Sequence, residues 1–453
     1  MDKTEKGLMT KGSIVKEIVF FSIPLLIGNL FQQMYSVIDS VMVGNYVGTD
    51  ALAAVGSSTP LINMMIGLFM GFATGAGVII SQYFGADDRK NLKKATNTCV
   101  MIGFIGGIIL MILGIIFSRV MIDVIGTPED VQEAANTFLK IYFMGGIPIV
   151  MYNVVSGIMR ALGDSRTPLY FLCLSSVINI MLDILFVKNL GFGIKGAGYA
   201  TLISQTISAV LVFITLLRQK DIYMVSLKSL AIDSKILIRI IKVGIPAGLQ
   251  QSIIAFSNVL VQGYINLFGT DAVAGCGAYI KIDGFIILPV LSFGMAQTIF
   301  IGQNYGAGKM DRVKKGAIVS SIISVSYSII VSIILLIFSR GIVSIFSTDE
   351  NVIYFGVKML FYFAPFYIFG AGIQCFCGLL RGFSKATPPM LIMTANLCGV
   401  RLIWLFIMSH FADTIDYVCF GYPLTWITGF ICFIVYMFFV KDKLFNKKYA
   451  CEN

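Results

Sequence analysis

The sequence predicts an all-α polytopic membrane protein, and three observations support this fold class. Of the 453 residues, 57% are apolar and 13% are charged, whereas a soluble protein has about 25% charged residues. The mean hydropathy is +0.86. The apolar residues form long continuous runs, unlike the short alternating segments of a membrane β-barrel. These features exclude a soluble enzyme, a disordered scaffold and a disulfide-rich secreted domain.

Twelve of the apolar runs are long enough to cross a bilayer, which takes about 20 helical residues. We therefore expect twelve transmembrane helices. Gly67, Gly71 and Gly75 in the second run follow the spacing of small residues that lets two helices approach closely. The expected spans are 18–44, 52–82, 95–117, 131–159, 168–187, 196–217, 236–266, 272–301, 316–338, 352–380, 389–410 and 415–440.

The distribution of basic residues predicts the orientation of these helices. If the N-terminus is cytoplasmic, 26 of the 34 Lys and Arg residues fall in cytoplasmic segments. Only Arg119, Lys188, Lys195 and Arg340 fall in external loops. Because the excess of Lys and Arg marks the cytoplasmic side, both termini are expected to be cytoplasmic.

The second half of the chain repeats the first at one constant offset. The tetrapeptide that begins at Gly48 returns at Gly269, and Gln82-Tyr-Phe-Gly-Ala aligns at the same offset with Gln303-Asn-Tyr-Gly-Ala. With six spans each, both halves enter the membrane from the same side, as parallel internal repeats do. We expect two six-helix bundles, an N-terminal lobe and a C-terminal lobe joined by a cytoplasmic linker, with bounds 1–217, 236–453 and 218–235 respectively.

The net charge of +10 and the nine cysteines point to no cofactor. The basic residues lie in short loops, which favours contact with membrane lipids over nucleic acid binding. The chain has one histidine, His410, so we expect no metal centre and no disulfide framework. Residues 302–309 resemble a phosphate-binding loop, but Met310 stands where that loop has Ser or Thr. Transport without an ATPase must use an ion gradient or run downhill, and we expect a monomer.

Charged and polar residues inside the spans are the candidate functional groups, because they are costly there. Asp39, Asn179, Asp183 and Thr201 all fall in the outer half of the N-terminal bundle when depth is counted at ~1.5 Å per residue. Their oxygens suit a hard cation such as Na⁺. The two carboxyl groups could instead share a proton, since neighbouring carboxylates resist being ionised together.

The C-terminal half lacks this cluster and carries Lys281, Asp283 and Arg401 at mid-depth instead. Two interpretations are open. Asp283 could form a structural ion pair with Arg401 or Lys281, or these three residues could serve the substrate or a proton. Span 7 has no carboxylate to match Asp39, and its polar groups near that place are Gln250, Gln251 and Asn258.

Several features of the sequence form one pattern: Asp39, the paired Ile23-Pro24 and Ile245-Pro246, the Gln-x-x-Gly-Ala ends of spans 2 and 8, and the turns after Arg160 and Arg381. Together they resemble the multidrug and toxic compound extrusion (MATE) family, in particular its prokaryotic branch with the DNA-damage-inducible and staphylococcal-type multidrug pumps. The resemblance implies a secondary active antiporter in the bacterial plasma membrane. It would export organic, cationic or amphipathic compounds by alternating access, in exchange for H⁺ or Na⁺.

The same resemblance implies roles for individual residues. Asp39, Asn179, Asp183 and Thr201 match the cation site of similar members. Tyr35 and Asn153 match residues of the substrate cavity, to which we add Gln251, Asp283, Lys281 and Arg401 as candidates. The carboxylate that some members carry in span 7 is missing here, which puts an ion site in the C-terminal lobe in doubt.

Three other functions stay open. A major facilitator transporter also has six plus six spans, but its loop motif after span 2 is replaced here by Gly-Ala-Asp-Asp-Arg-Lys-Asn. A lipid-linked precursor flippase of the same superfamily would need a cationic cavity, to which Lys281 and Arg401 would contribute. A membrane enzyme would need a nucleophile motif or metal ligands, and the sequence shows neither, so we expect no enzyme.

The predicted orientation can be tested with reporter fusions. Reporters placed after residue 453 and within 218–235 should read cytoplasmic, and one near Asp413 should read external, because basic residues favour the cytoplasmic side. An external reading within 218–235 would contradict the parallel repeat.

Overall fold

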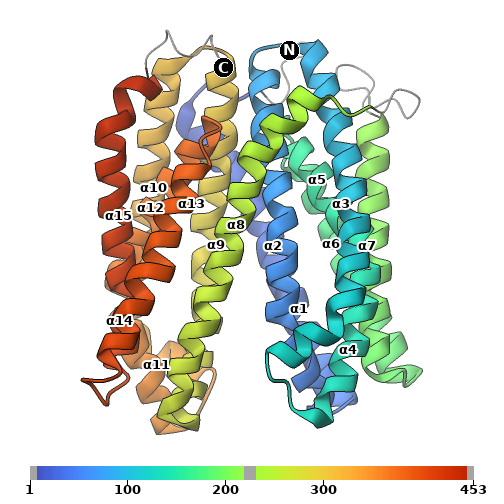
Figure 1. Cartoon of the computed structure of the whole chain (residues 1–453), viewed down its shortest axis with the longest axis vertical. Helices are drawn as coiled ribbons and strands as arrows, with labels where there is room; N and C mark the ends of the chain where they lie inside the picture. Colours follow the sequence, from blue (N-terminus) through green and yellow to red (C-terminus); the bar gives the residue numbers. More distant parts are fainter. Residues whose placement is uncertain (1–7, 219–230, 446–453) are drawn as a thin grey trace. The chain divides into compact units, whose positions relative to one another are not determined.

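Long apolar helices account for nearly all of the described chain in the computed structural model (Figure 1), which describes residues 8–218 and 231–445. No strand occurs among these residues. Most of the expected linker 218–235 lies outside them. Eleven helices are long and apolar enough to cross a membrane, or twelve if α4 and α5, which meet at a 49° bend, form one span. The predicted all-α membrane fold is confirmed, with eleven to twelve candidate spans where twelve were predicted, and the orientation of the termini stays a prediction.

The described residues form two compact units. Ile23–Ser252 belong to the first unit, and Met9–Ser22 and the residues from Ile253 onward belong to the second. α1 (Ile14–Tyr46) and α8 (Ser234–Ile265) therefore each contribute to both units. The segment before α1 is fixed within the second unit by Arg312, which donates hydrogen bonds of 2.7 to 3.3 Å to the carbonyls of Met9, Lys11 and Gly12.

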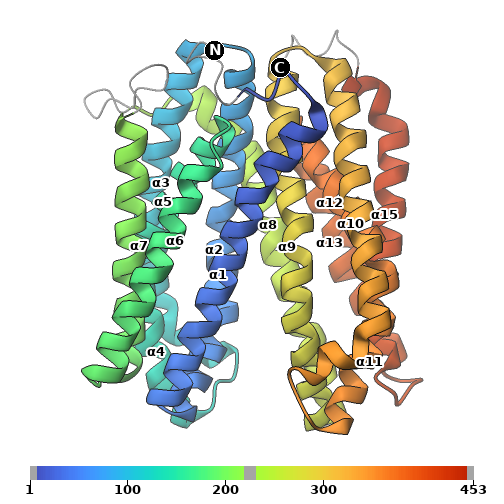
Figure 2. The same cartoon turned by 180° about the vertical axis from the view of Figure 1, so that it is seen from behind.

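The first unit contains the larger part of α1, the first part of α8, and six further α-helices. A short π-helical segment, η2 (Ile184–Asn189), continues the last turn of α6. α6 and α7 pack side by side, as Figure 2 shows from behind. The six helices are α2 (Thr49–Gly85), α3 (Arg89–Val124), α4 (Glu129–Met144), α5 (Gly146–Ala161), α6 (Arg166–Asp183) and α7 (Gly193–Arg218).

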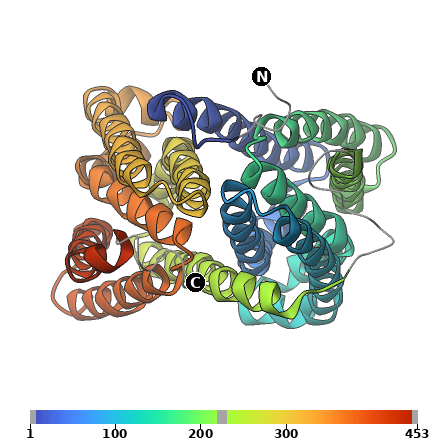
Figure 3. The ribbon, with the colours of Figure 1, turned by 90° about the horizontal axis from the view of Figure 1, so that it is seen from above.

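The second unit contains the rest of α8 and seven further α-helices, and Figure 3 shows the helices of each unit end on. Three short segments interrupt them: η4 (Asn266–Phe268), η5 (Ala364–Phe366) and the π-helical η6 (Ala395–Val400). The helices are α9 (Thr270–Gly306), α10 (Met310–Ser344), α11 (Glu350–Phe363), α12 (Tyr367–Gly382), α13 (Thr387–Thr394), α14 (Arg401–Met408) and α15 (Asp416–Phe445).

The helix bounds reproduce the sequence repeat. The first and last residues of α2 and α9 are related by the same offset that relates Gly48 to Gly269, and so are those of α5 and α12. The bend between α4 and α5 has its counterpart in the short η5 segment between α11 and α12. The two halves thus fold into the same succession of helices, as the repeat predicts.

A close crossing of α2 and α8 positions the helices of the first unit. A Cβ atom on Gly71 would lie 2.3 Å from the carbonyl oxygen of Gly244 and 2.3 Å from the amide nitrogen of Gly248. A Cβ on Gly75 would lie 2.6 Å from the Ile240 oxygen. Backbone meets backbone here, so only glycine fits. The close approach that the glycine spacing predicts is confirmed for these two residues.

Replacing Gly71 tests this crossing. Gly71→Ala should lower the stability of the purified protein by about 1–3 kcal/mol, because the two backbones must move apart to admit a methyl group. Thermal unfolding in detergent would measure the loss. Gly67→Ala is the matched control, because its Cβ would meet only ordinary contacts at 3.6 Å or more. Equal melting temperatures for the two variants would contradict the crossing.

Candidate functional site

The four polar residues predicted from depth come together in the first unit. α1 contributes Asp39, α6 contributes Asn179 and Asp183, and α7 contributes Thr201. All four side chains are buried, with exposed fractions of 8% for Asp39, 1% for Asn179, 0% for Asp183 and 4% for Thr201. Counted to the end of α1, to the end of the segment that continues α6 to Asn189, and from the start of α7, the four residues lie six to ten residues from a helix end, or ~9–15 Å by helical rise. We call these four residues the carboxylate cluster.

Hydrogen bonds connect the members of the carboxylate cluster. The carboxyl groups of Asp39 and Asp183 lie close enough to share a hydrogen bond. With its amide oriented to suit its neighbours, Asn179 donates to Asp183 Oδ2 at 3.1 Å and accepts from the Thr201 amide at 3.3 Å. The Thr201 hydroxyl lies 3.5 Å from the hydroxyl of Tyr35. The cluster therefore joins three helices through polar contacts alone.

The local sequence explains how these side chains are held. Asn179 and Asp183 are one turn apart, so they share a face of α6. Asp183 is the last α-helical residue before the π-helical segment η2, and such wider turns often occur at functional sites. α6 is fixed against α7 by Ser175, whose hydroxyl donates to the Ser204 carbonyl at 2.9 Å. The cluster thus rests on two helices with little freedom to separate.

Two oxygens of the carboxylate cluster have no partner. Asp39 Oδ1 and Asp183 Oδ1 are buried and accept no hydrogen bond within the described chain. Buried acceptors in folded proteins are nearly always satisfied, so an unmatched pair calls for an explanation. A proton or a small cation between the carboxyl groups would satisfy both, and would also remove the repulsion between two neighbouring negative charges.

The sequence analysis did not identify Tyr142, which lies beside the carboxylate cluster. The hydroxyl of Tyr142, on α4, lies within electrostatic range of both Asp39 and Tyr35. No charge or motif marks Tyr142 in the sequence, since tyrosines occur throughout the spans.

The predicted cavity residues Asn153 and Gln251 lie apart from this cluster. Asn153 donates a hydrogen bond of 2.8 Å to the Ile149 carbonyl of its own helix. Gln251 is exposed on α8. Within the described chain, no hydrogen bond or ion pair joins Asn153 or Gln251 to the carboxylate cluster, and their role in a substrate cavity stays a prediction.

In the second unit, Asp283 forms no ion pair among the described residues. It accepts hydrogen bonds from the hydroxyls of Tyr367 at 2.7 Å and Tyr279 at 3.3 Å. Lys281 is exposed. The structural pair of Asp283 with Arg401 or Lys281 is therefore wrong as an interpretation. Depth alone brought these residues together in the prediction, but the rotation of each helix about its axis points them at different neighbours.

Arg401 is 2% exposed and surrounded by neutral groups. It donates to Thr425 at 3.0 Å, to Ser257 at 3.2 Å and to Asn258 at 3.4 Å. Its guanidinium carbon lies 4.3 Å from the ring centroid of Tyr422, in a cation–π contact. We call Arg401 with these four neighbours the arginine cluster.

The arginine cluster occupies the place in the second repeat that the carboxylate cluster occupies in the first. The repeat offset relates Tyr422 to Thr201 and Thr425 to Ser204, and it relates Ser257 to Tyr35 with a slippage of one position. Arg401 comes one residue after Val400, the position equivalent to Asn179. Both clusters lie beside a π-helical segment: Arg401 comes directly after η6, and Asp183 comes directly before η2. The offset could have found these residues from the sequence alone. The two repeats therefore build polar clusters of opposite charge at equivalent positions.

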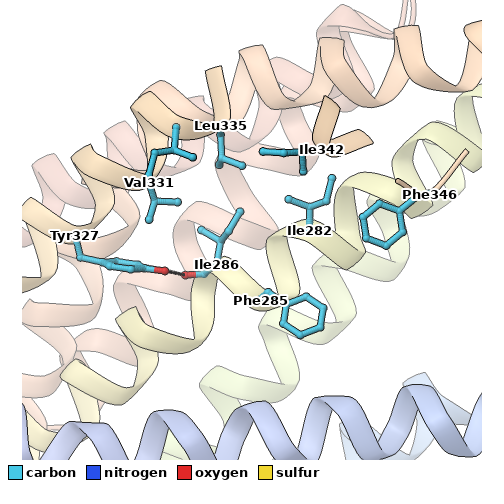
Figure 4. A pocket seen from close by; sticks show the side chains of 9 residues that line it. Ile282, Phe285, Ile286, Tyr327, Val331, Leu335, Ile342 and Phe346 are labelled. Carbon is cyan, nitrogen blue, oxygen red and sulfur yellow. Dashed lines mark hydrogen bonds between the residues drawn. The ribbon is translucent and has the colours of Figure 1, made fainter. Parts of the chain in front are cut away.

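A separate apolar pocket of about 400 Å³ opens between α9 and α10 (Figure 4). Its walls are aliphatic and aromatic, and the hydroxyl of Tyr327 donates a hydrogen bond of 3.2 Å to the Ile286 carbonyl. The pocket has room for the apolar part of a small molecule but offers no charged group. It is therefore unsuited to binding a coupling ion.

The comparison with known families follows the two halves of the chain. A family model described as MatE matches residues 24–185 and again residues 246–407. The chain belongs to the MatE family. The two matched segments begin at Pro24 and Pro246, the paired prolines of the repeat, so each covers one repeat. Members of this family are transporters, and the many apolar helices identify a multi-pass protein of the bacterial cell membrane.

Individual relatives agree with this assignment. The chain is 29% identical over 456 residues to the probable multidrug resistance protein YoeA of Bacillus subtilis (strain 168), with 98% of each chain covered. It is 31% identical over 389 residues to the probable multidrug resistance protein YpnP of the same strain, with 86% of each covered. A crystal structure of MATE in the bent conformation has the same fold, with a TM-score of 0.90, 22% identity and 100% of each chain covered.

Proposed function

We propose that this protein is a secondary active antiporter that exports organic, cationic or amphipathic compounds in exchange for an ion carried by the carboxylate cluster. The observation that carries the proposal is the buried pair of Asp39 and Asp183, each with one unmatched oxygen. The relatives that are named multidrug resistance proteins support the substrate class.

The energetics of the pair explain why it would carry an ion. An ionised Asp at mid-membrane costs about 3 kcal/mol on insertion scales. Two carboxylates about 4 Å apart repel by about 4 kcal/mol more at an effective dielectric constant of about 20. A proton or a metal cation removes most of this cost. The pair therefore holds a cation whenever it is closed off from water, and it releases that cation only when water reaches the pair.

Exchange follows if an organic cation and the coupling ion neutralise the same two carboxyl groups. Binding of one then disfavours binding of the other, because their affinities are linked through the charge of the pair. In alternating access, the cluster would take up the coupling ion from outside and release it inside, while the organic compound moves outward. We also propose that both termini lie on the cytoplasmic side of the membrane.

We favour H⁺ as the coupling ion, because the Asp39 and Asp183 carboxyl groups are close enough to hold one proton between them. Na⁺ is the second candidate. It is favoured by the unmatched carboxylate oxygens together with the nearby Thr201 hydroxyl, an oxygen set that suits a hard cation.

Neutralising Asp39 tests the proposed role of the pair. Asp39→Asn keeps the shape of the side chain but removes its charge, so efflux driven by an ion gradient should fall to the level of empty vesicles. The measurement is dye efflux from vesicles with Na⁺ and pH gradients imposed separately. Asp50→Asn, at an exposed position on α2, is the control and should transport normally. Undiminished efflux by Asp39→Asn would leave Asp39 a structural residue.

Replacing Thr201 distinguishes the two coupling ions. Thr201→Val removes one oxygen at nearly constant volume. Under Na⁺ coupling, the apparent Na⁺ affinity should fall by about tenfold, equivalent to ~1.4 kcal/mol for one lost ligand. Under H⁺ coupling, efflux should change little and should run without Na⁺. Thr206→Val, exposed on the same helix, is the matched control. Efflux that needs Na⁺ at fixed pH and ignores an imposed proton gradient would overturn our preference for H⁺.

A further inference from the structure

Arg401 is a buried cation without a counter-ion. Its side chain is 2% exposed, and no carboxylate of the described residues forms an ion pair with it. An arginine stays charged in any protein environment. A buried charge is normally compensated by an opposite charge, because removing it from water is costly. The hydroxyl and amide oxygens of the arginine cluster supply dipoles but no negative charge.

The guanidinium of Arg401 also has N–H groups that donate no hydrogen bond within the described residues. Of its five donors, Nη1 is used for Ser257 and Asn258, and one N–H of Nη2 is used for Thr425. The Nε–H group is buried and has no acceptor. Nε and Nη2 lie on the same edge of the guanidinium, the edge on which carboxylates bind through two parallel hydrogen bonds. The unsatisfied donor is therefore on the edge best suited to an anion.

The surroundings explain how an anion could reach this edge. Asn258 contacts Arg401 and is itself exposed on α8; farther along, Gln262 on α8 donates a hydrogen bond of 2.9 Å to Asn266, the first residue of η4. Exposed amides within a membrane helix face water or polar groups, because lipid cannot satisfy them. The ring of Tyr422 covers the face of the guanidinium, which leaves the edge for a ligand.

We propose that the arginine cluster is a binding site for a monovalent anion, either a halide or the carboxylate group of an organic compound. A single negative charge balances the single charge of Arg401, whereas a dianion would leave a net negative charge buried in the unit. The site is distinct from the carboxylate cluster and does not depend on which ion that cluster carries. It gives the second repeat a preference for anionic groups, opposite to that of the first.

Bromide provides a direct probe, because it binds as chloride does and quenches tryptophan fluorescence at close range. Trp426 follows Thr425 in α15, and its ring centroid is 6.3 Å from that of Tyr422. Trp404 is the other tryptophan of the chain, so the full-length Trp404→Phe variant reports on Trp426 alone. In lipid nanodiscs at constant ionic strength with gluconate, bromide should quench this signal with a saturable component. Chloride should reverse that component.

Two substitutions test whether Arg401 holds the anion. Arg401→Gln should abolish the saturable component. Asn258→Asp keeps the size of the side chain and supplies an internal counter-ion 3.4 Å from Nη1, so it should weaken bromide binding at least about tenfold while preserving the packing. Asn266→Asp makes the same chemical change in η4, just beyond the end of α8, and should bind bromide as the parent does. Because Asn258→Asp leaves the arginine in place, the result does not depend on whether Arg401→Gln folds.

Competing anions distinguish the two sources of the negative charge. Displacement of bromide by chloride and acetate alike indicates a site for small free anions. If bromide shows no saturable quenching, benzoate is titrated instead, and raised thermal stability that Asn258→Asp abolishes indicates the carboxylate of an organic compound. The proposal is overturned if neither anion binds saturably, or if both bind Asn258→Asp and Asn266→Asp equally well.

Discussion

Two carboxyl groups buried side by side within a membrane protein cannot both remain ionised without a cation, and this constraint organises the first unit. The pair formed by Asp39 and Asp183 joins α1 to α6, and Asn179 extends the contact to α7 through the Thr201 amide. The crossing of α2 and α8 at Gly71 supports the same unit from another side. In our proposal, the free energy of keeping this pair neutral is what couples an ion gradient to the export of a cation.

The second repeat uses the same helices for the opposite charge. Its equivalent position holds a guanidinium among the side chains of Ser257, Thr425 and Tyr422, and Asp283 lies elsewhere, bound by two tyrosine hydroxyls. An internal repeat thus preserves the succession of helices, while the π-helical segments η2 and η6 fall at different positions and the chemistry of the two clusters diverges. The carboxylate cluster requires a bound cation, whereas the arginine cluster already contains one, the guanidinium of Arg401. The two clusters therefore cannot bind the same ion.

Much of this arrangement follows from sequence, and the rest depends on helix rotation. Hydropathy and the repeat predict the helices and their order, and depth along each span brings Asp39, Asn179, Asp183 and Thr201 to one level. Depth does not determine which side of a helix faces which neighbour, and this is why the expected partner of Asp283 was wrong. Tyr279 and Tyr367, its actual partners, are unremarkable in a chain with 19 tyrosines. The π-helical segments η2 and η6 leave no clear periodicity in an apolar run.

The central claim is that an organic cation and a proton compete for the carboxylate cluster, and proton release on binding tests it most directly. The purified protein would be mixed with a permanently charged organic cation, such as tetraphenylphosphonium, in weakly buffered solution containing a pH indicator. The account predicts release of about one proton per bound cation by the wild-type protein and none by Asp39→Asn, because the two ligands are linked through the charge of the pair. Cation binding with no proton release, and with an affinity that is the same at every pH, would contradict it.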